Sequence, residues 1–280
     1  MNSHFSLNCQ GRLHYFRRPV VMGIVNLTPD SFYPDSRKMN TDAALQTVAE
    51  MKEAGAEMID IGAQSSRPGA EWLGAEEEWE RMKYILPKLV EVFPELLFSV
   101  DTFHSQVAKL ALENGAHIIN DISGGQFDDT MLTVVGEFAA PYICMHTKGK
   151  PAEMAKMNQY CNILVDIMNF FTERIKSCHK AGINDVILDP GFGFAKNVEQ
   201  NFELLHKMEA FRIFDCPLLF GISRKSLIYR TVGGDASRAL NGTTVLNTVG
   251  LQKGAAILRV HDVKEAVEAI SLLEEIEKYS

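Results

Sequence analysis

A helix that ends on a glycine and is followed by an apolar run recurs four times in this chain of 280 residues. The four glycines are Gly55, Gly115, Gly182 and Gly254. Glycine takes the left-handed backbone conformation that ends a helix just before the chain enters a sheet. Because successive recurrences lie two strand–helix units apart, the pattern predicts a long and regular alternation of strands and helices.

Eight short apolar runs are the predicted strands. They are rich in Val, Ile, Leu and Met without strict polar–apolar alternation, which is typical of strands covered on both faces. The runs are 20–27, 58–63, 96–100, 117–122, 141–145, 186–188, 218–222 and 256–260. Apolar residues at helical spacing lie between them and predict helices that include 41–54, 76–92, 158–181 and 264–279.

This alternation predicts an α/β fold, a (β/α)8 TIM barrel formed by a single domain. An open doubly wound sheet is the alternative. We expect residues 19–280 to form the barrel and residues 1–18 to be an N-terminal extension or a small hairpin over the barrel floor. The chain has no linker or low-complexity segment that would divide it further.

The composition argues against several classes of protein. A net charge of −8 argues against broad binding to nucleic acid. No apolar run approaches the roughly 18 residues that a membrane-spanning helix needs. The five cysteines are odd in number and include no C-x-x-C pair, so we expect reduced thiols in a reducing compartment. The sequence therefore predicts a cytoplasmic protein that binds neither nucleic acid nor a membrane.

Polar residues stand at the ends of the predicted strands, where an apolar core would not place them. They are Asn26, Gln64, Asp101, Asn120, His146, Asp189, Ser223, Lys225, Arg259 and His261. The carboxyl ends of the strands of a TIM barrel meet at one face, and the active sites of this fold lie there. We therefore expect these side chains to share one site.

The residue types at this face suit two kinds of ligand group. Asp101, Asn120 and Asp189 offer donors and acceptors for a flat, nitrogen-rich heterocycle, and each would carry a desolvation cost if left unpaired. The positive charge of Arg259, with Arg67 and His261, suits a phosphate or diphosphate. A neutral oxygen ligand such as Asn26 is enough for a Mg²⁺ ion that is bound mainly through a diphosphate.

Two loops above this face are expected to act as lids that exclude water. The first is 28–37, which is long for its position and carries Phe32, and the second is 65–69. Simple packing of Phe32 against the rim of the barrel is the alternative for that residue.

The chain resembles the dihydropteroate synthase family in eight segments that follow one another in the family's order. The segments are 22–32 (MGIVNLTPDSF), 60–70 (DIGAQSSRPGA), 99–102 (SVDT), 119–121 (IND), 145–146 (MH), 188–194 (LDPGFGF), 223–226 (SRKS) and 259–261 (RVH). Each segment alone is a weak signal, but the ordered set is specific and covers nearly the whole chain.

The resemblance implies a role for each matching position. The pterin would be held by Asp101, Asn120, Asp189 and Lys225. The diphosphate would be bound by Asn26, which would also ligate Mg²⁺, and by Ser66, Arg259 and His261. The p-aminobenzoate would be bound by Phe32, Arg67, Pro68, Phe194 and Ser223. The groups nearest the chemistry would be Asp101, Lys225, Arg259 and His261.

The resemblance also implies a reaction and an assembly. Mg²⁺ and basic groups would stabilise a leaving diphosphate, the pterin methylene would become a delocalised cation beside Asp101, and the aryl amine would attack it in an SN1-like displacement. The partners would be small-molecule substrates and a second copy of the chain in a homodimer formed through late helices. Sulfonamides mimic p-aminobenzoate, so inhibition by them is expected.

The chain departs from the family pattern in two places. The family usually has Glu-Ser-Thr before Arg-Pro, whereas this chain has Gln-Ser-Ser at 64–66, which removes a charge and can alter an internal hydrogen bond. In the first loop the chain has FYPDSR at 32–37, where the family usually has Asp-Gly-Gly. Asp35 of the first loop is expected to pair with Arg67 of the second when the lids close.

Two other functions stay open at this point. A pterin-binding barrel that moves a methyl group from methyl-tetrahydrofolate to a corrinoid protein would share the Asp-Asn-Asp pocket, but it would not need Lys225 or the pair of Arg259 and His261. A barrel that keeps the fold as a non-catalytic subunit or binding module is the other alternative, and a turnover assay would distinguish it.

Overall fold

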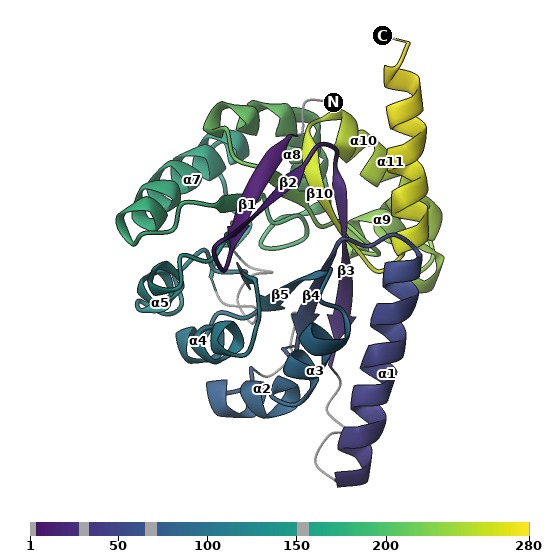
Figure 1. The fold of residues 1–280 in the computed structure, drawn as a ribbon. Coiled ribbons are helices and arrows are strands. Elements are labelled where there is room, and N and C mark those ends of the chain that lie inside the picture. The colour runs from purple at the N-terminus through teal and green to yellow at the C-terminus, as the bar shows by residue number, and fades with distance from the viewer. Residues whose placement is uncertain (1–3, 28–33, 65–71, 150–156, 280) are drawn as a thin grey trace.

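Eight parallel strands form a closed barrel in the computed structural model (Figure 1), which describes residues 4–27, 34–64, 72–149 and 157–279, with the side chains of all but 34–40. The order is β10-β3-β4-β5-β6-β7-β8-β9, and β10 pairs with β3 to close the ring. The strands are β3 Val20–Asn26, β4 Met58–Gly62, β5 Leu97–Asp101, β6 Ile118–Asp121, β7 Tyr142–Met145, β8 Val186–Asp189, β9 Leu218–Phe220 and β10 Ala255–Val260. The predicted (β/α)8 barrel is confirmed, and the open sheet is excluded because the first and last barrel strands pair.

Helices surround the barrel (Figure 1). They are α1 Pro34–Glu53, α2 Ala75–Met82, α3 Ile85–Val92, α4 Ser105–Glu113, α5 Met131–Glu137, α7 Ile163–Lys180, α8 Val198–Lys207, α9 Ser226–Val232, α10 Leu240–Gln252 and α11 Val263–Glu277, with two 3-10 helices, η1 Met208–Phe214 and η2 Ala236–Arg238. The four predicted glycine stops are confirmed, since Gly55, Gly115, Gly182 and Gly254 have φ values of 99°, 96°, 93° and 102°. Only glycine adopts this region without strain.

Three predicted helices have different bounds in the structure. The prediction of one helix over 76–92 is wrong, because α2 and α3 are separated one turn before Pro87, which lacks an N–H and clashes with the carbonyl four residues earlier. α1 begins at Pro34, so residues 34–37, expected in the first loop, are helical. α7 begins at Ile163, because the side chain of Asn162 caps the helix by accepting a hydrogen bond of 3.2 Å from Val165 N.

A two-stranded antiparallel hairpin precedes the barrel and lies across one of its ends (Figure 1). β1 (Phe5–Cys9) pairs with β2 (Arg12–Phe16). Leu7 and Cys9 are buried against residues from the amino-terminal halves of the barrel strands, such as Val20, Met58 and Ile187. Because apolar side chains close this end, the polar groups inside the barrel belong to the opposite, carboxyl end, which we call the mouth.

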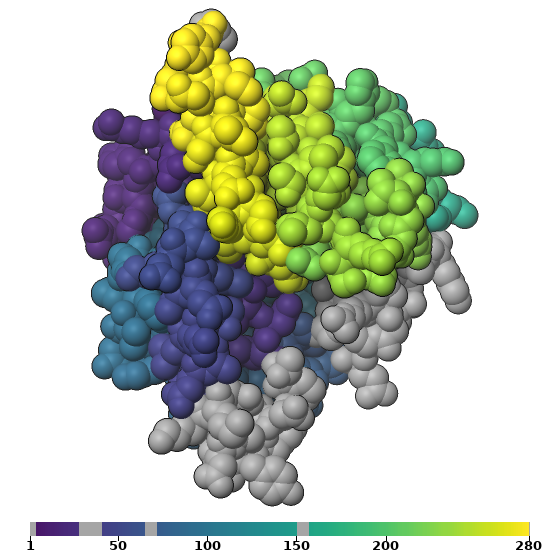
Figure 2. Space-filling view, turned by 90° about the vertical axis from the view of Figure 1, so that its right-hand side faces the viewer, coloured from purple at the N-terminus to yellow at the C-terminus, as the bar shows by residue number. Residues whose placement is uncertain are grey.

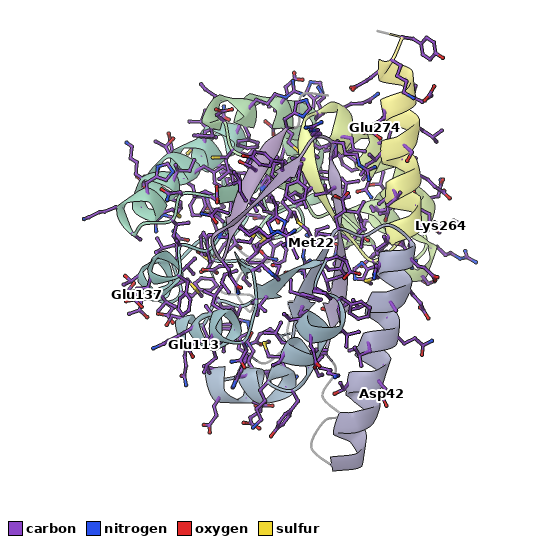
Figure 3. The ribbon with its side chains drawn as sticks, viewed as in Figure 1. Met22, Asp42, Glu113, Glu137, Lys264 and Glu274 are labelled. Carbon is purple, nitrogen blue, oxygen red and sulfur yellow. The ribbon has the colours of Figure 1, made fainter. Side chains whose placement is uncertain are left out.

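The outer surface carries the charged side chains. Met22 lies inside the barrel, whereas Asp42 and Lys264 point outward from the helices (Figure 3). α1 and α11 lie next to one another on one face (Figure 2), and a Cβ on Gly55, just after α1, would lie 3.2 Å from Val267 of α11. Over the described ranges, no helix is both long and apolar enough to cross a membrane.

Candidate active site

The strand ends of β4, β5, β6 and β10 bring four polar side chains into contact at the mouth. Arg259 Nε donates to Asp60 Oδ2 at 2.6 Å, and an Arg259 terminal nitrogen donates to Asp101 Oδ2 at 3.0 Å. Asn120 Nδ2 donates to the same Asp60 oxygen at 2.9 Å. Barrel closure makes these contacts, because Asp60 and Arg259 are 199 residues apart in the sequence. We call Asp60, Asp101, Asn120 and Arg259 the Asp60 cluster.

Asp60 is a residue that the sequence reasoning missed. Its side chain is fully buried, and its second carboxylate oxygen, Oδ1, has no hydrogen-bond partner among the residues that the structure describes. A buried carboxylate is costly unless it is paired, so the interruption of the apolar run 58–63 by an aspartate was the available signal. The hydrogen bonds from Arg259 and Asn120 offset the free-energy cost of burying the Asp60 carboxylate.

Asp101 is the member of the cluster that faces the opening, and 22% of its side chain is exposed. Burial raises the pKa of Asp101 to about 7, against the pull of Arg259, and the neighbouring carboxylates of Asp60, Asp121 and Asp189 add to the rise. The carboxyl group therefore titrates close to neutral pH in the ligand-free protein. A cation placed beside it would favour its charged form.

A second group lies beside this cluster, at the ends of β8 and β9. Lys225 Nζ donates to Phe192 O at 2.5 Å and lies 4.5 Å from the centroid of the Phe194 ring. A Cβ on Gly221 would lie 3.8 Å from Asp189 Oδ2 and 3.9 Å from Lys225 Nζ, so both groups face the space over this glycine. Burial lowers the pKa of Lys225 to about 8, and the carboxylate of Asp189 opposes that shift.

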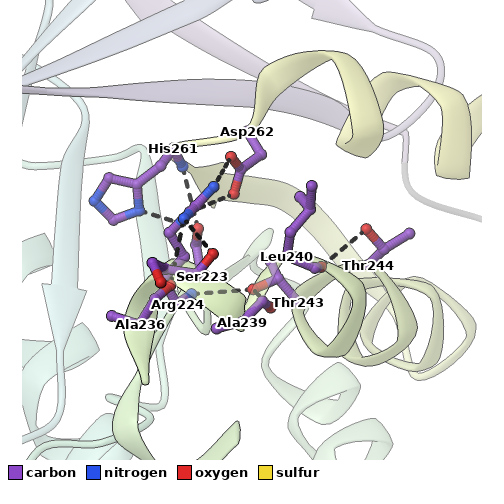
Figure 4. A network of polar contacts seen from close by, with 10 residues as sticks. Ser223, Arg224, Ala236, Ala239, Leu240, Thr243, Thr244, His261 and Asp262 are labelled. Atoms are coloured by element: carbon purple, nitrogen blue, oxygen red, sulfur yellow. Dashed lines mark hydrogen bonds and ion pairs between the residues drawn. The ribbon is translucent and has the colours of Figure 1, made fainter. Parts of the chain in front are cut away.

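The third group joins the ends of β9 and β10 (Figure 4). Ser223 Oγ lies 3.0 Å from His261 Nδ1 and accepts a hydrogen bond of 3.2 Å from His261 N. The next residues form a two-point ion pair, with Arg224 Nε and a terminal nitrogen at 2.9 and 2.6 Å from the two Asp262 oxygens. Arg224 therefore fixes the loop rather than facing a ligand, and it holds Ser223 and His261 together.

Asn26 ends β3 with an exposed side chain. A Cβ on Gly62 would lie 3.7 Å from Asn26 Oδ1 and 3.6 Å from Asp101 Cβ, so the amide and the carboxylate flank the same glycine. In the part of the chain that the structure describes, no group of three or more His, Cys, Asp or Glu side chains could hold a metal ion. A metal at Asn26 would therefore need oxygen ligands from a substrate or water.

Some of the site residues expected from the sequence lie outside the described residues. They are Phe32, Ser66, Arg67 and Pro68, and the side chain of Asp35 is not described either. Two others are bonded elsewhere, since Gln64 is bonded to Leu73 and His146 is buried against Lys196. The remaining ones are brought to the mouth in the three groups above, and Asn26 stands next to them.

Residues 22–261 match the model of a family described as pterin binding enzyme. A dihydropteroate synthase of Escherichia coli strain K12 is 38% identical over 270 residues, which covers 96% of this chain and 95% of that protein. The chain belongs to the dihydropteroate synthase family.

Solved structures of dihydropteroate synthases have the same fold. A Yersinia pestis dihydropteroate synthase in complex with a sulfonamide drug gives a TM-score of 0.91 at 37% identity and covers 99% of this chain and 100% of that one. A Xanthomonas albilineans dihydropteroate synthase with 4-aminobenzoic acid gives 0.89 at 34% identity, with 97% and 98% covered. The chain is accordingly a transferase of folate biosynthesis, and the methyl-transferring alternative is set aside.

Gln64, where the chain departs from the usual sequence of dihydropteroate synthases, makes hydrogen bonds that suit an amide. Gln64 Nε2 donates to Leu73 O at 2.9 Å, and Gln64 Oε1 accepts from Leu73 N at 3.1 Å. Nε2 also lies 3.5 Å from Oε2 of the fully buried Glu78. An ionised glutamate at position 64 could not donate to Leu73 O. Both polar atoms of the Gln64 amide are thus hydrogen-bonded in place of the charge that a glutamate would carry.

Glu78 makes the stability of the protein depend on pH. Burial raises the pKa of Glu78 from its usual 4.5 to about 8. Between these values the unfolded chain has lost the proton and the folded protein keeps it, so the free energy of unfolding falls as the pH rises. Glu78→Gln removes the carboxyl group that takes up this proton. We therefore expect the Tm of the variant, relative to the Tm of the unmodified chain, to rise from pH 5 to pH 8. Thermal denaturation at several pH values in this range measures the difference in Tm between the two proteins. A difference that does not change with pH would contradict the raised pKa of Glu78.

Proposed function

We propose that the mouth joins 6-hydroxymethyl-7,8-dihydropterin diphosphate to p-aminobenzoate, giving 7,8-dihydropteroate and diphosphate. Three subsites would form there, each from side chains of more than one of the three groups. The observation that carries this proposal is the placement of Asp101, Asp189, Lys225 and Arg259 around one opening. These groups pair two carboxylates with two cations at one opening, which suits a polar heterocycle joined to an anion.

The pterin subsite comprises Asp101, Asn120, Asp189 and Lys225. Carboxylates accept hydrogen bonds and the lysine donates them, while the Asn120 amide does both, so the set can match a ring with alternating donors and acceptors. Asp189 Oδ1 accepts from Gly191 N at 2.8 Å, which fixes the carboxylate in place. The pocket is therefore pre-arranged, and ring binding loses little side-chain entropy.

The diphosphate subsite comprises Asn26, Ser66, Arg259 and His261. Arg259 uses only part of its guanidinium on Asp60 and Asp101, which leaves N–H groups for an anion. Burial and the nearby Arg259 both lower the pKa of His261. A bound diphosphate would raise that pKa again and favour a charge-assisted hydrogen bond.

The p-aminobenzoate subsite comprises Phe32, Arg67, Pro68, Phe194 and Ser223. Phe194 offers a ring face and Ser223 a hydroxyl at the start of the loop before α9, a combination that fits an aromatic carboxylate. The lysine stem of Lys225 lies between this subsite and the pterin subsite, so the two rings would meet there.

Mg²⁺ fits beside the diphosphate subsite. Asn26 supplies a neutral amide oxygen at the exposed end of β3, next to Asp101. Hard oxygen ligands suit this ion, and one protein ligand is enough where a diphosphate supplies others. When bound, the ion neutralises charge on the leaving diphosphate. Asn26 would hold it, and Arg259 and His261 would add to the same stabilisation.

The proposed reaction is an SN1-like displacement. The bond between the pterin methylene and the diphosphate oxygen breaks first, and the electron pair leaves with the diphosphate. The carboxylate of Asp101 stabilises the cation that forms on the pterin. The amine nitrogen of p-aminobenzoate then forms the new bond and loses a proton. Exclusion of water from the mouth protects the cation.

We also propose that the protein is a cytoplasmic homodimer that binds no nucleic acid. The five cysteines are all free, which suits a reducing compartment. Val245 on α10 and Leu272 and Ile276 on α11 are exposed apolar side chains, and the two helices lie next to one another on one face (Figure 2). Light scattering after gel filtration tests the dimer, and a monomeric mass would rule it out.

Diphosphate release tests the function. Purified protein is given hydroxymethyl-dihydropterin diphosphate and Mg²⁺, with and without p-aminobenzoate, and we expect diphosphate and dihydropteroate to form together. Pterin binding without any turnover would instead favour the non-catalytic barrel.

A further inference from the structure

Lys196 is a buried lysine that none of the three subsites uses. It lies in the loop 190–197 between β8 and α8, and only 9% of the residue is exposed. Its Nζ donates to Gly191 O at 2.9 Å and to Phe194 O at 3.1 Å. The same nitrogen lies 3.1 Å from His146 Nδ1 and 3.4 Å from His146 O. Lys196 thus connects this loop to the residue that follows β7.

The loop has a backbone conformation that needs such support. Gly191, Gly193 and Ala195 have φ values of 71°, 82° and 48°. A Cβ on Gly191 would lie 2.0 Å from His146 O, so the two backbones touch there. Ala195 reaches the left-handed region only at a cost in free energy. Strained conformations of this kind persist where surrounding contacts determine them, and the bonds from Lys196 to the carbonyls of residues 191 and 194 are such contacts.

The same loop carries groups of the candidate active site. Phe192 O accepts from Lys225 Nζ, and the Phe194 ring lies under the same ammonium. Lys196 and Lys225 therefore hold carbonyls of the same short segment. We propose that Lys196 is a positioning residue that fixes the loop 190–197 and thereby sets the Phe194 ring for p-aminobenzoate.

Packing alone does not explain a lysine at this position. A buried ammonium group is costly, and burial lowers the pKa of Lys196 to about 7 although Asp189 opposes the shift. Methionine would fill a similar volume without that cost. Lysine differs from methionine here in its hydrogen bonds. The bonds to His146 also attach the loop to the residue that follows β7.

The test compares Lys196→Met and Lys196→Gln with the control Tyr160→Phe. Tyr160 OH donates to Ala195 O at 3.2 Å, so the control removes one hydrogen bond to the same loop without touching the carbonyls that Lys196 holds. We expect Lys196→Met to raise the KM for p-aminobenzoate about tenfold, because the aromatic platform is misplaced. Lys196→Gln keeps two N–H donors, so its KM should lie between those of Lys196→Met and the unmodified chain. The KM of the control should stay within about twofold of that of the unmodified chain.

The pterin is the internal reference in this test. The pterin diphosphate should bind to Lys196→Met within about threefold of its affinity for the unmodified chain, as measured by calorimetry, since Lys196 makes no hydrogen bond to Asp101, Asn120, Asp189 or Lys225. An unchanged KM for p-aminobenzoate in both variants would overturn the proposal, and so would a parallel loss of pterin affinity, which indicates general damage. Lys196→Gln decides the matter if Lys196→Met does not fold. The inference rests on the proposed use of Phe194 for p-aminobenzoate, and absence of turnover in the unmodified chain would refute that function separately.

Discussion

Asp101→Asn is expected to reduce kcat by about 100-fold or more while the protein stays folded. Asparagine keeps the shape of the side chain but removes the charge that would face the pterin cation, and preorganised electrostatic groups of this kind are typically worth that much or more. The remaining partner of Arg259, Asp60, still holds the guanidinium at 2.6 Å. Steady-state turnover, with circular dichroism to establish folding, measures the effect.

The matched control is Asp185→Asn. Asp185 accepts a hydrogen bond of 2.7 Å from Asn8 N of the hairpin, at the end of the barrel opposite the mouth. The same chemical change there should leave kcat within about twofold, because the site is far from the chemistry. Near-normal turnover in Asp101→Asn would remove this carboxylate from the mechanism and leave the cation to be stabilised by other groups.

Arg259→Ala is expected to weaken diphosphate binding by about 1.5–3 kcal/mol, the value of a hydrogen bond to a charged group. Calorimetry with the pterin diphosphate and with the pterin alcohol, which lacks the anion, separates this loss from any effect on the ring. Equal losses for the two ligands would place Arg259 in the pterin subsite instead. Unchanged affinity for both would remove Arg259 from the site.

The same substitution should also lower the Tm. Asp60 is fully buried and, among the described residues, would keep only Asn120 as a partner. An uncompensated buried charge is strongly destabilising, by about 3–5 kcal/mol. Arg259→Lys is the second variant, because it retains a cation near Asp60 without the planar group that bonds Asp60 and Asp101 together. Its Tm should lie between those of the unmodified chain and Arg259→Ala.

The fold was largely predictable because its signals are local. Gly55, Gly115, Gly182 and Gly254 end helices through a backbone preference that belongs to each residue alone, and the apolar runs mark strands that are covered on both faces. The signal for the break before Pro87 is equally local. The prediction of a single helix over 76–92 was wrong because it relied on the apolar spacing and did not take the proline into account.

The sequence by itself determined the barrel, the family and most of the polar residues at the mouth, because strand order and the carboxyl ends of parallel strands follow from the alternation of elements. It did not single out Asp60. Only the tertiary structure decided which of these residues pair. The contact of Asp60 with Arg259 and that of His146 with Lys196 join residues 199 and 50 positions apart. Such contacts depend on the register of a closed barrel and on side-chain rotamers, which no local pattern specifies.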